Sequence, residues 1–160
     1  MKVGVIGIGV VGNANKVGFE QLGHEVVVHD IKLGTKINDV LDTEAVFLCV
    51  PTPSASNGSC DTTIVKSVIM DLNQLKYKGI IAIRSSTVPG FSQSMIDAYP
   101  KLKICFVPEF IRERHAVEDF IKDHTILVIG THDDSTFNIV KTCHGHYPKF
   151  VKQLKPTEAE

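Results

Sequence analysis

Three glycines near the start of the chain have the spacing of a phosphate-binding turn. Gly7, Gly9 and Gly12 form G-x-G-x-x-G, after the apolar residues 3–6 and before a segment that can form a helix. In such a turn the first glycine permits a tight bend, the second lets the backbone approach a pyrophosphate, and the third lets the helix pack closely on the strand. The helix N-terminus then offers free N–H groups to the phosphates. The predicted site consists of Gly7, Ile8, Gly9, Val10, Val11 and Gly12.

An aspartate stands where a dinucleotide-binding protein needs a ribose ligand. Asp30 ends the next apolar segment, 18 residues after Gly12, which is the context that the glycine pattern requires. Its carboxylate can accept hydrogen bonds from the adenosine ribose hydroxyls and would repel a 2′-phosphate, so the sequence favours NAD over NADP. The alternative is a glycine-rich turn that packs an α/β sheet and binds no ligand.

Apolar segments alternate with helix-compatible segments along the whole chain. We expect strands at residues 3–6, 26–30, 45–50, 79–83, 103–107, 125–129 and 149–151, and helices at 11–22, 61–75, 91–98 and 134–143. Such alternation is typical of β-α-β units and a parallel sheet with helices on both faces. The sequence therefore predicts a single α/β domain over residues 1–154, with a doubly wound, mostly parallel, Rossmann-like sheet. Residues 155–160 are expected to form a polar tail that adds nothing to the core.

Composition excludes several other classes of protein. The 160 residues carry 17 Lys and Arg against 18 Asp and Glu, a formal net charge of −1, so no basic excess favours nucleic acid. No apolar run approaches the ~18 residues of a membrane span, and the glycine-interrupted residues 1–11 do not resemble a signal peptide. We expect a cytoplasmic protein without a membrane or nucleic-acid partner.

Cysteines and histidines do not form a recognisable metal motif. The four cysteines include no C-x-x-C pair. Cys143, His144 and His146 fall within four consecutive residues, and side chains so close in sequence cannot easily converge on one tetrahedral ion. We expect no metal site, and an ordinary surface turn after a helix at this position.

Further candidate residues lie in loops that follow predicted strands, where open α/β sheets bind their ligands. Pro51 and Pro53 follow the third strand, and Thr87 follows the fourth. Taken alone, the prolines could simply end a strand, and the threonine hydroxyl could make a local cap. Glu109 and Glu113 could likewise form one exposed helix face that Arg112 and Arg114 solvate.

Three segments nevertheless resemble the signature of the nucleotide-sugar dehydrogenases, which include the UDP-glucose and UDP-N-acetylmannosamine 6-dehydrogenases. They are residues 50–53 (V-P-T-P) with 57–61 behind them, residues 86–90 (S-T-V-P-G), and residues 108–113 (P-E-F-I-R-E). Together with the glycine turn they occur in the order and at the approximate spacing of that family. The resemblance covers about the whole chain and implies an NAD-binding domain.

The resemblance also implies a role for each matching position. Thr87 would hold a catalytic water and Glu109 would act as an acid/base. The implied cofactor contacts, besides the glycine turn and Asp30, are Val50, Pro51, Thr52, Pro53, Ser86, Thr87, Val88 and Glu113. The implied border of the sugar substrate consists of Glu109, Phe110, Ile111, Arg112 and Glu113.

The reaction of that family needs groups that this sequence does not contain. Two hydride transfers to NAD oxidise a primary alcohol to a carboxylate, and a cysteine thiolate holds the intermediate. The family's G-x-C-x-P-K-D segment is absent, and residues 155–160 resemble the lead-in to its connecting helix. We therefore expect the NAD-binding domain of a UDP-sugar 6-dehydrogenase that does not turn over alone and that binds UDP-sugar only together with a C-terminal half. Alternatives are a non-catalytic NAD-sensing or partner-binding module derived from such an enzyme, and another β-hydroxyacid-type dehydrogenase.

Overall fold

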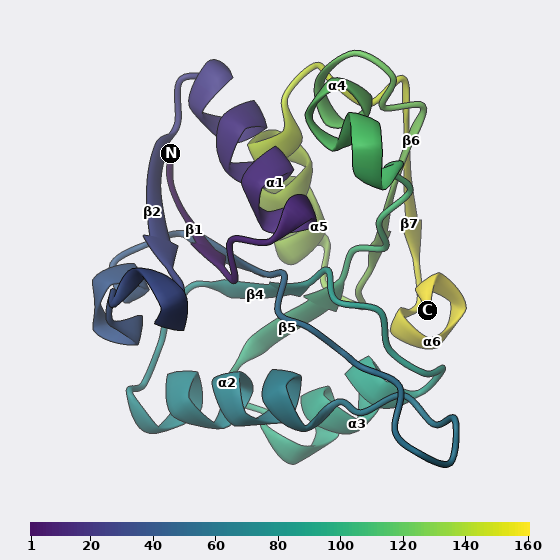
Figure 1. Ribbon diagram of the computed structural model, residues 1–160. Helices are drawn as coiled ribbons and strands as arrows, with labels where there is room; N and C mark the ends of the chain where they lie inside the picture. Colours follow the sequence, from purple (N-terminus) through teal and green to yellow (C-terminus); the bar gives the residue numbers. More distant parts are fainter.

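Seven strands form one sheet in the order β2-β1-β3-β4-β5-β6-β7 in the computed structural model, which describes residues 1–160 (Figure 1). They are β1 (Lys2–Ile6), β2 (Glu25–His29), β3 (Ala45–Leu48), β4 (Ile80–Ile83), β5 (Lys103–Phe106), β6 (Ile126–Gly130) and β7 (Phe150–Leu154). Each predicted strand is present, with ends that differ by a few residues at most. The single, mostly parallel α/β sheet predicted from the sequence is confirmed.

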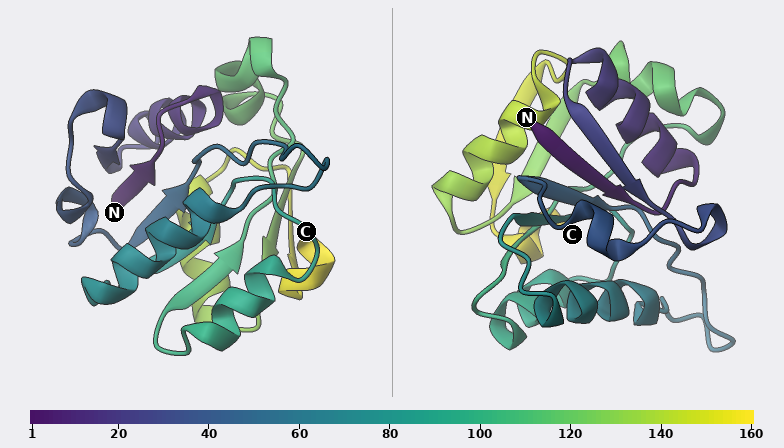
Figure 2. Two further views of the ribbon diagram at one scale, coloured as in Figure 1. Left: turned by 60° about the horizontal axis from the view of Figure 1, so that its bottom comes forward. Right: turned by 90° about the vertical axis from the view of Figure 1, so that its left-hand side faces the viewer.

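Six helices cover the two faces of this sheet. They are α1 (Val10–Gln21), α2 (Thr63–Gln74), α3 (Phe91–Ala98), α4 (Ala116–Ile121), α5 (Asp134–His144) and α6 (Pro156–Ala159). Helices α1, α4 and α5 lie on one face, and α2, α3 and the short α6 on the other (Figures 1 and 2). No helix has the length and apolar character needed to cross a bilayer.

The central strands are apolar throughout because both of their faces are covered. All residues of β3 and β4 are buried, which explains why neither strand alternates polar with apolar residues. Phe47 of β3 packs toward α1 and α4 through Phe19 and Phe120, whereas Leu48 packs toward α2 through Ile69. This double burial fixes the positions of the loops that follow these strands.

Strand order determines where a ligand can bind. Strand β2 lies on one side of β1 and β3 on the other, and all of these pairs are parallel. The connection after β1 therefore leads to one side of the sheet, and the connection after β3 leads to the other. As a result, the two loops separate at the carboxyl ends of β1 and β3. In open α/β sheets this switch point is the usual ligand crevice.

Strand β6 departs from a fully parallel sheet. It pairs antiparallel with β5 through Phe106 and Gly130, and β7 then pairs parallel with β6. The connection after β5 contains α4, which packs against α1. This connection does not return to the edge of the sheet at which β5 begins, so β6 runs in the opposite direction to β5.

Two expectations from the sequence are wrong. Residues 155–160 do contribute to the core, because Pro156 and Ala159 of α6 are buried against β6. Residues 143–146 are not simply a surface turn, because Cys143 and His144 end α5 and are fully buried, whereas His146 is exposed. His144 packs against the rings of Phe19, Phe47 and Phe120.

Candidate active site

The glycine turn joins β1 to α1 and depends on two glycines. Gly7 has φ of +88°, a backbone conformation that other residues rarely adopt, and its N–H donates to the His29 carbonyl at 2.8 Å. A Cβ on Gly12 would lie 1.8 Å from the Gly7 carbonyl oxygen, so only glycine lets the helix pack this close. Helix α1 begins at Val10, directly after the turn.

Asp30 directly follows β2, and its carboxylate contacts the glycine turn. One carboxylate oxygen accepts from the Ile8 N–H at 2.7 Å and the other from the Lys32 N–H at 2.8 Å. These two backbone N–H groups, Ile8 first, hold the pKa of Asp30 below its ordinary value. The side chain is therefore a carboxylate at neutral pH, and each oxygen keeps a free lone pair for a hydroxyl.

A cavity of about 260 Å³ opens between the loops after β1, β2 and β3. Gly7, Gly9 and Asp30 give it a polar wall, while Pro51 and Ile64 belong to its apolar part. The other lining residues are Ile6, Ile8, His29, Ile31, Lys32, Cys49, Val50 and Val68. An apolar cleft with a few fixed polar groups is the form that nucleotide sites usually take.

The start of α1 fits a phosphate group. No side chain caps this helix, so its first N–H groups are not used by a capping residue. A Cβ on Gly9 would meet nothing within 4 Å, which leaves open space in front of the helix. The cavity, the uncapped helix and the Asp30 carboxylate together fit a dinucleotide.

Loops after β3 and β4 lie side by side at the same edge. The Ser85 hydroxyl donates to the Val50 carbonyl at 2.7 Å, and the Cys60 thiol lies 3.6 Å from the Ser86 carbonyl. The first contact links the V-P-T-P segment to the residue before S-T-V-P-G, and the second links residues 57–61 to Ser86. Thr52, Pro53, Ser86, Thr87 and Val88 do not line the cavity described above.

A buried ion pair connects β4 to the loop after β5. Arg84 directly follows β4, its side chain is only 1% exposed, and its guanidinium donates to the Glu109 carboxylate. Glu109 is 14% exposed and borders a second cavity, of about 390 Å³. Glu109 is thus a carboxylate held by a buried cation at the rim of a cavity.

Arg84 is itself held from behind by His144 and Phe120. His144 Nδ1 lies 2.8 Å from the Val140 carbonyl, which can only accept, so Nδ1 carries the proton and Nε2 faces Arg84 Nη1 at 3.4 Å. The Phe120 ring centroid lies 5.7 Å from the guanidinium carbon. Burial lowers the pKa of Arg84 to about 10, which leaves it charged at neutral pH.

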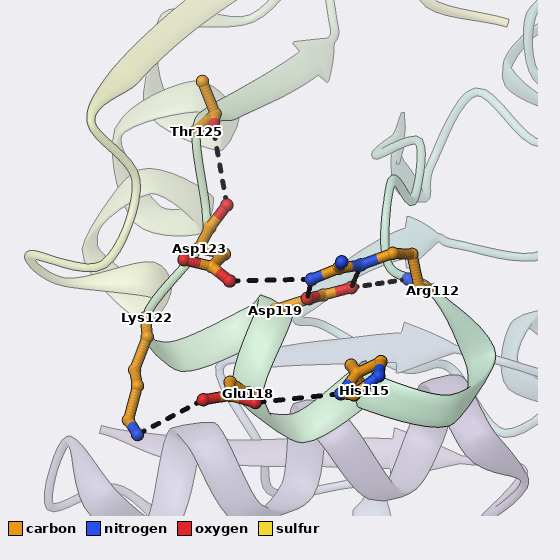
Figure 3. Close-up of polar contacts among 7 residues, drawn as sticks. All are labelled: Arg112, His115, Glu118, Asp119, Lys122, Asp123 and Thr125. Atoms are coloured by element: carbon orange, nitrogen blue, oxygen red, sulfur yellow. Dashed lines mark hydrogen bonds and ion pairs between the residues drawn. The ribbon is translucent and has the colours of Figure 1, made fainter.

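Two aspartates, Asp119 and Asp123, hold the Arg112 side chain (Figure 3). Its guanidinium and its backbone N–H all donate to Asp119, at 2.5 to 3.0 Å, and Asp123 lies 3.6 Å away. The Arg112 hydrogen bonds hold the pKa of Asp119 down, to about 2. The same cavity of about 390 Å³ is lined by Pro108, Glu109, Phe110, Ile111, Arg112, Asp119, Asp123, His124, Thr125 and Ile126.

Glu113 stands apart from Glu109. It begins a short 3₁₀ turn and lines a third, shallower cavity of about 610 Å³ together with Val10 and Asn13 of the glycine-turn helix. The exposed helix face considered for the pair from sequence does not form, because residues 108–112 are not helical. Val11 and Gly12 belong to α1 and line none of the three cavities.

Thiol chemistry has little support in this chain. Burial raises the pKa of Cys49 and of Cys143 to about 12, and raises that of Cys105 further. A thiol with so high a pKa is a poor nucleophile at neutral pH. Cys60 is partly exposed, and its thiol lies 3.6 Å from the Ser86 carbonyl.

Sequence reasoning did not identify Arg84, Asp119 or Glu160 as site residues. Arg84 was detectable in principle, since a charged residue directly after a fully apolar strand must lie at the ligand-binding edge. The bonds of Asp119 reach from α4 back to Arg112, seven residues earlier and before the helix begins. Glu160 accepts from the Thr87 hydroxyl at 3.1 Å across 73 residues, a contact that no local pattern predicts.

Comparison with known proteins identifies the family. Residues 32–148 match the NAD binding domain of the UDP-glucose/GDP-mannose dehydrogenase family. The UDP-glucose 6-dehydrogenase of Haloferax volcanii is 28% identical over 86% of this chain and 42% of its own length. That of Rickettsia felis is 35% identical over 65% of this chain and 24% of its own length. The chain spans less than half the length of these relatives.

Solved structures show the same fold. The UDP-glucose dehydrogenase of Pyrobaculum islandicum superposes with a TM-score of 0.86 over 99% of this chain and 47% of its own, at 24% identity. The GDP-mannose dehydrogenase of Pseudomonas aeruginosa gives 0.83 over 99% and 47%, at 21% identity. With the glycine turn, the carboxylate at the end of β2 and the matched residues 32–148, the chain belongs to the UDP-glucose/GDP-mannose dehydrogenase family and is its NAD-binding domain.

Proposed function

We propose that this chain is the cofactor half of a UDP-sugar 6-dehydrogenase and that NAD lies across the carboxyl edge of its sheet. The adenosine would occupy the cavity of about 260 Å³, with its ribose on Asp30. The pyrophosphate would lie against the uncapped start of α1. The observation that carries the proposal is that the Asp30 carboxylate is bonded to the Ile8 N–H of the glycine turn, next to the open space at Gly9.

The nicotinamide half would extend toward the loops after β3, β4 and β5. When bound, NAD supplies the hydride acceptor for alcohol oxidation. Val50, Pro51, Thr52 and Pro53 would border its path, with Ser86, Thr87 and Val88 on the nicotinamide side. Glu113 would face the cofactor from the cavity that it shares with Val10 and Asn13.

Glu109 is the proposed acid/base of this site. Its carboxylate is held by Arg84 and borders the cavity that also contains Phe110, Ile111 and Arg112. A sugar bound there would place its primary alcohol within reach of a carboxylate that can accept the hydroxyl proton. Thr87 would hold the water that the second, hydrolytic stage needs.

The isolated chain is proposed to bind NAD without oxidising a UDP-sugar. The covalent stage needs an activated thiolate, and the buried thiols of Cys49, Cys105 and Cys143 have strongly raised pKa values. The family resemblance supplies that thiol from a segment that is not in this sequence. UDP-sugar binding would likewise need the second half.

Two measurements on the chain test the proposal. NADH fluorescence titration should show saturable binding that ADP-ribose competes away. Incubation with NAD and UDP-glucose should give no NADH, against the ~10 per second typical of a complete enzyme. Robust turnover would disprove the proposed dependence on a second half, and an absence of NADH and ADP-ribose binding would disprove the proposed cofactor site.

A further inference from the structure

We propose that Glu160 is a positioning residue that fixes the Thr87 loop beside the nicotinamide. The inference deepens the proposed function and rests on it. Its structural basis is one carboxylate that accepts four hydrogen bonds from residues 87–92. All four bonds span about 70 residues of sequence, so they fix the loop through the fold and not through its own turn.

The bonds come from both sides of the start of α3. Glu160 Oε2 accepts from the Gly90 N–H at 2.6 Å. Oε1 accepts from the Ser92 N–H and hydroxyl, each at 2.7 Å, and from the Thr87 hydroxyl at 3.1 Å. Helix α3 has no capping side chain of its own, so Glu160 supplies the cap from outside, and its negative charge suits the positive end of the helix dipole.

Thr87 depends on this contact for its orientation. The Glu160 carboxylate is the one side-chain group bonded to its hydroxyl, and neighbouring Ser86 and Val88 are exposed. A carboxylate can only accept, so the Thr87 hydroxyl proton points at Glu160. The hydroxyl oxygen therefore keeps its lone pairs free, ready to accept a hydrogen bond from a water.

Helix α6 places Glu160 at this point. Figures 1 and 2 show α6 beside α3, and it packs on β6 through Pro156 and Ala159. A Cβ on Gly130 would lie 2.7 Å from the Ala159 methyl and 3.1 Å from the Pro156 Cα. The bare Gly130 backbone therefore sets how closely α6, and with it Glu160, approaches the Thr87 loop.

Two variants perturb the contact in different ways. Glu160→Gln keeps the size of the side chain, but its NH₂ end cannot accept from Gly90 or Ser92. Gly130→Ala leaves the carboxylate intact and displaces α6. Glu158→Gln is the matched control, because it makes the same charge change on α6 at an exposed residue that bonds only the Lys155 N–H.

The experiment compares NADH with ADP-ribose, which lacks the nicotinamide, in the 160-residue chain. In wild type and Glu158→Gln, NADH but not ADP-ribose should shift the NMR signal of the Thr87 methyl group. In Glu160→Gln and Gly130→Ala that shift should fall by more than half. NADH affinity should fall about five- to tenfold, the effect of one or two lost hydrogen bonds, with ADP-ribose affinity nearly unchanged.

A change in overall stability alone would lower the affinities for NADH and for ADP-ribose together. The inference is overturned if both variants retain the wild-type Thr87 shift, if wild-type Thr87 does not respond to NADH, or if NADH and ADP-ribose weaken in equal proportion. Wild-type chain that binds neither ligand would instead remove the proposed cofactor site itself, which separates the two failures.

Discussion

At the scale of single residues, Asp30 combines an observed contact with a proposed one. It organises the glycine turn through the Ile8 N–H, and its remaining lone pairs face the cavity in which a ribose would bind. A charge-assisted hydrogen bond is worth about 1.5–3 kcal/mol. Most of the discrimination between NAD and NADP should therefore depend on this side chain.

Replacement of Asp30 by Ala should weaken NAD binding by at least about tenfold, from the loss of one such bond. It should also narrow the preference for NAD over NADP, because the repulsion of a 2′-phosphate disappears. Calorimetric titration with both cofactors measures the two effects. Asp39→Ala is the control, since Asp39 is exposed and lies outside the cavity. An unchanged NAD/NADP ratio in Asp30→Ala would contradict the assigned role.

Removal of Glu109 and removal of Arg84 should lower the free energy of unfolding by different amounts. Loss of Glu109 leaves a fully buried charge without its partner, which costs about 3 kcal/mol or more. Loss of Arg84 leaves a carboxylate at a cavity rim, where water can reach it, and also removes a buried Nε–H that has no partner.

Glu109→Ala should therefore lower the free energy of unfolding more than Arg84→Met does, and the Arg84→Met cost should be about 1–2 kcal/mol. Urea denaturation of the two variants provides the comparison. Arg112→Met is a useful reference, because the Arg112 side chain is 67% exposed despite its bonds to Asp119. Equal losses for Glu109→Ala and Arg84→Met would show that the guanidinium is not effectively buried.

At the scale of elements, the turn between β1 and α1 contains one glycine that the packing of α1 requires and another that it does not. A Cβ on Gly9 meets no atom within 4 Å, whereas one on Gly12 meets the Gly7 carbonyl at 1.8 Å. Gly9 also has φ of −82°, which alanine adopts without strain.

Gly9→Ala should thus keep the wild-type melting temperature and weaken NADH binding, because its methyl group takes the space proposed for the pyrophosphate. Gly12→Ala should lower the melting temperature and NADH binding together, because α1 must move off the sheet. Thermal denaturation and NADH titration of both variants test the distinction. Normal NADH affinity in folded Gly9→Ala would mean that the phosphates lie elsewhere.

Some of the helices, strands and contacts can be predicted from the sequence, and others cannot. The strands and the long helices follow from apolar runs that glycine and proline interrupt, as at Gly79 before β4 and Gly90 before α3. Helix α4 was missed because its six residues follow a strongly charged run. The antiparallel β6, the burial of Arg84 and the Glu160 contact depend on how distant segments pack, which no local pattern records. The assigned site residues stay predictions until ligand binding is measured.

At the scale of the whole molecule, a buried histidine, His144, and a half-buried one, His124, make the stability of the fold depend on pH. His144 and His124 lie in one aromatic cluster beside Arg84. Burial first, and the Arg84 charge second, hold the pKa of His144 well below its ordinary value and that of His124 at about 4. The folded state therefore keeps both rings neutral at pH values where the unfolded chain protonates them.

The free energy of unfolding should fall as the pH drops below about 6.5, where the unfolded histidines begin to bind protons. The loss should reach about 1.4 kcal/mol per pH unit for each of the two rings. Urea denaturation between pH 7 and pH 4.5 measures it, above the range in which Asp119 titrates. His146→Gln, at an exposed position, should not change the slope, whereas His144→Phe should reduce it. A stability independent of pH over this range would contradict the neutral cluster.

The most direct test of the central claim is a crystal structure of this chain with NAD. We expect the adenosine ribose on the Asp30 carboxylate, the pyrophosphate at the first N–H groups of α1, and the nicotinamide beside Thr87. NAD bound at any other surface, or a cavity at Gly9 that stays empty at saturating NAD, would contradict the proposed site.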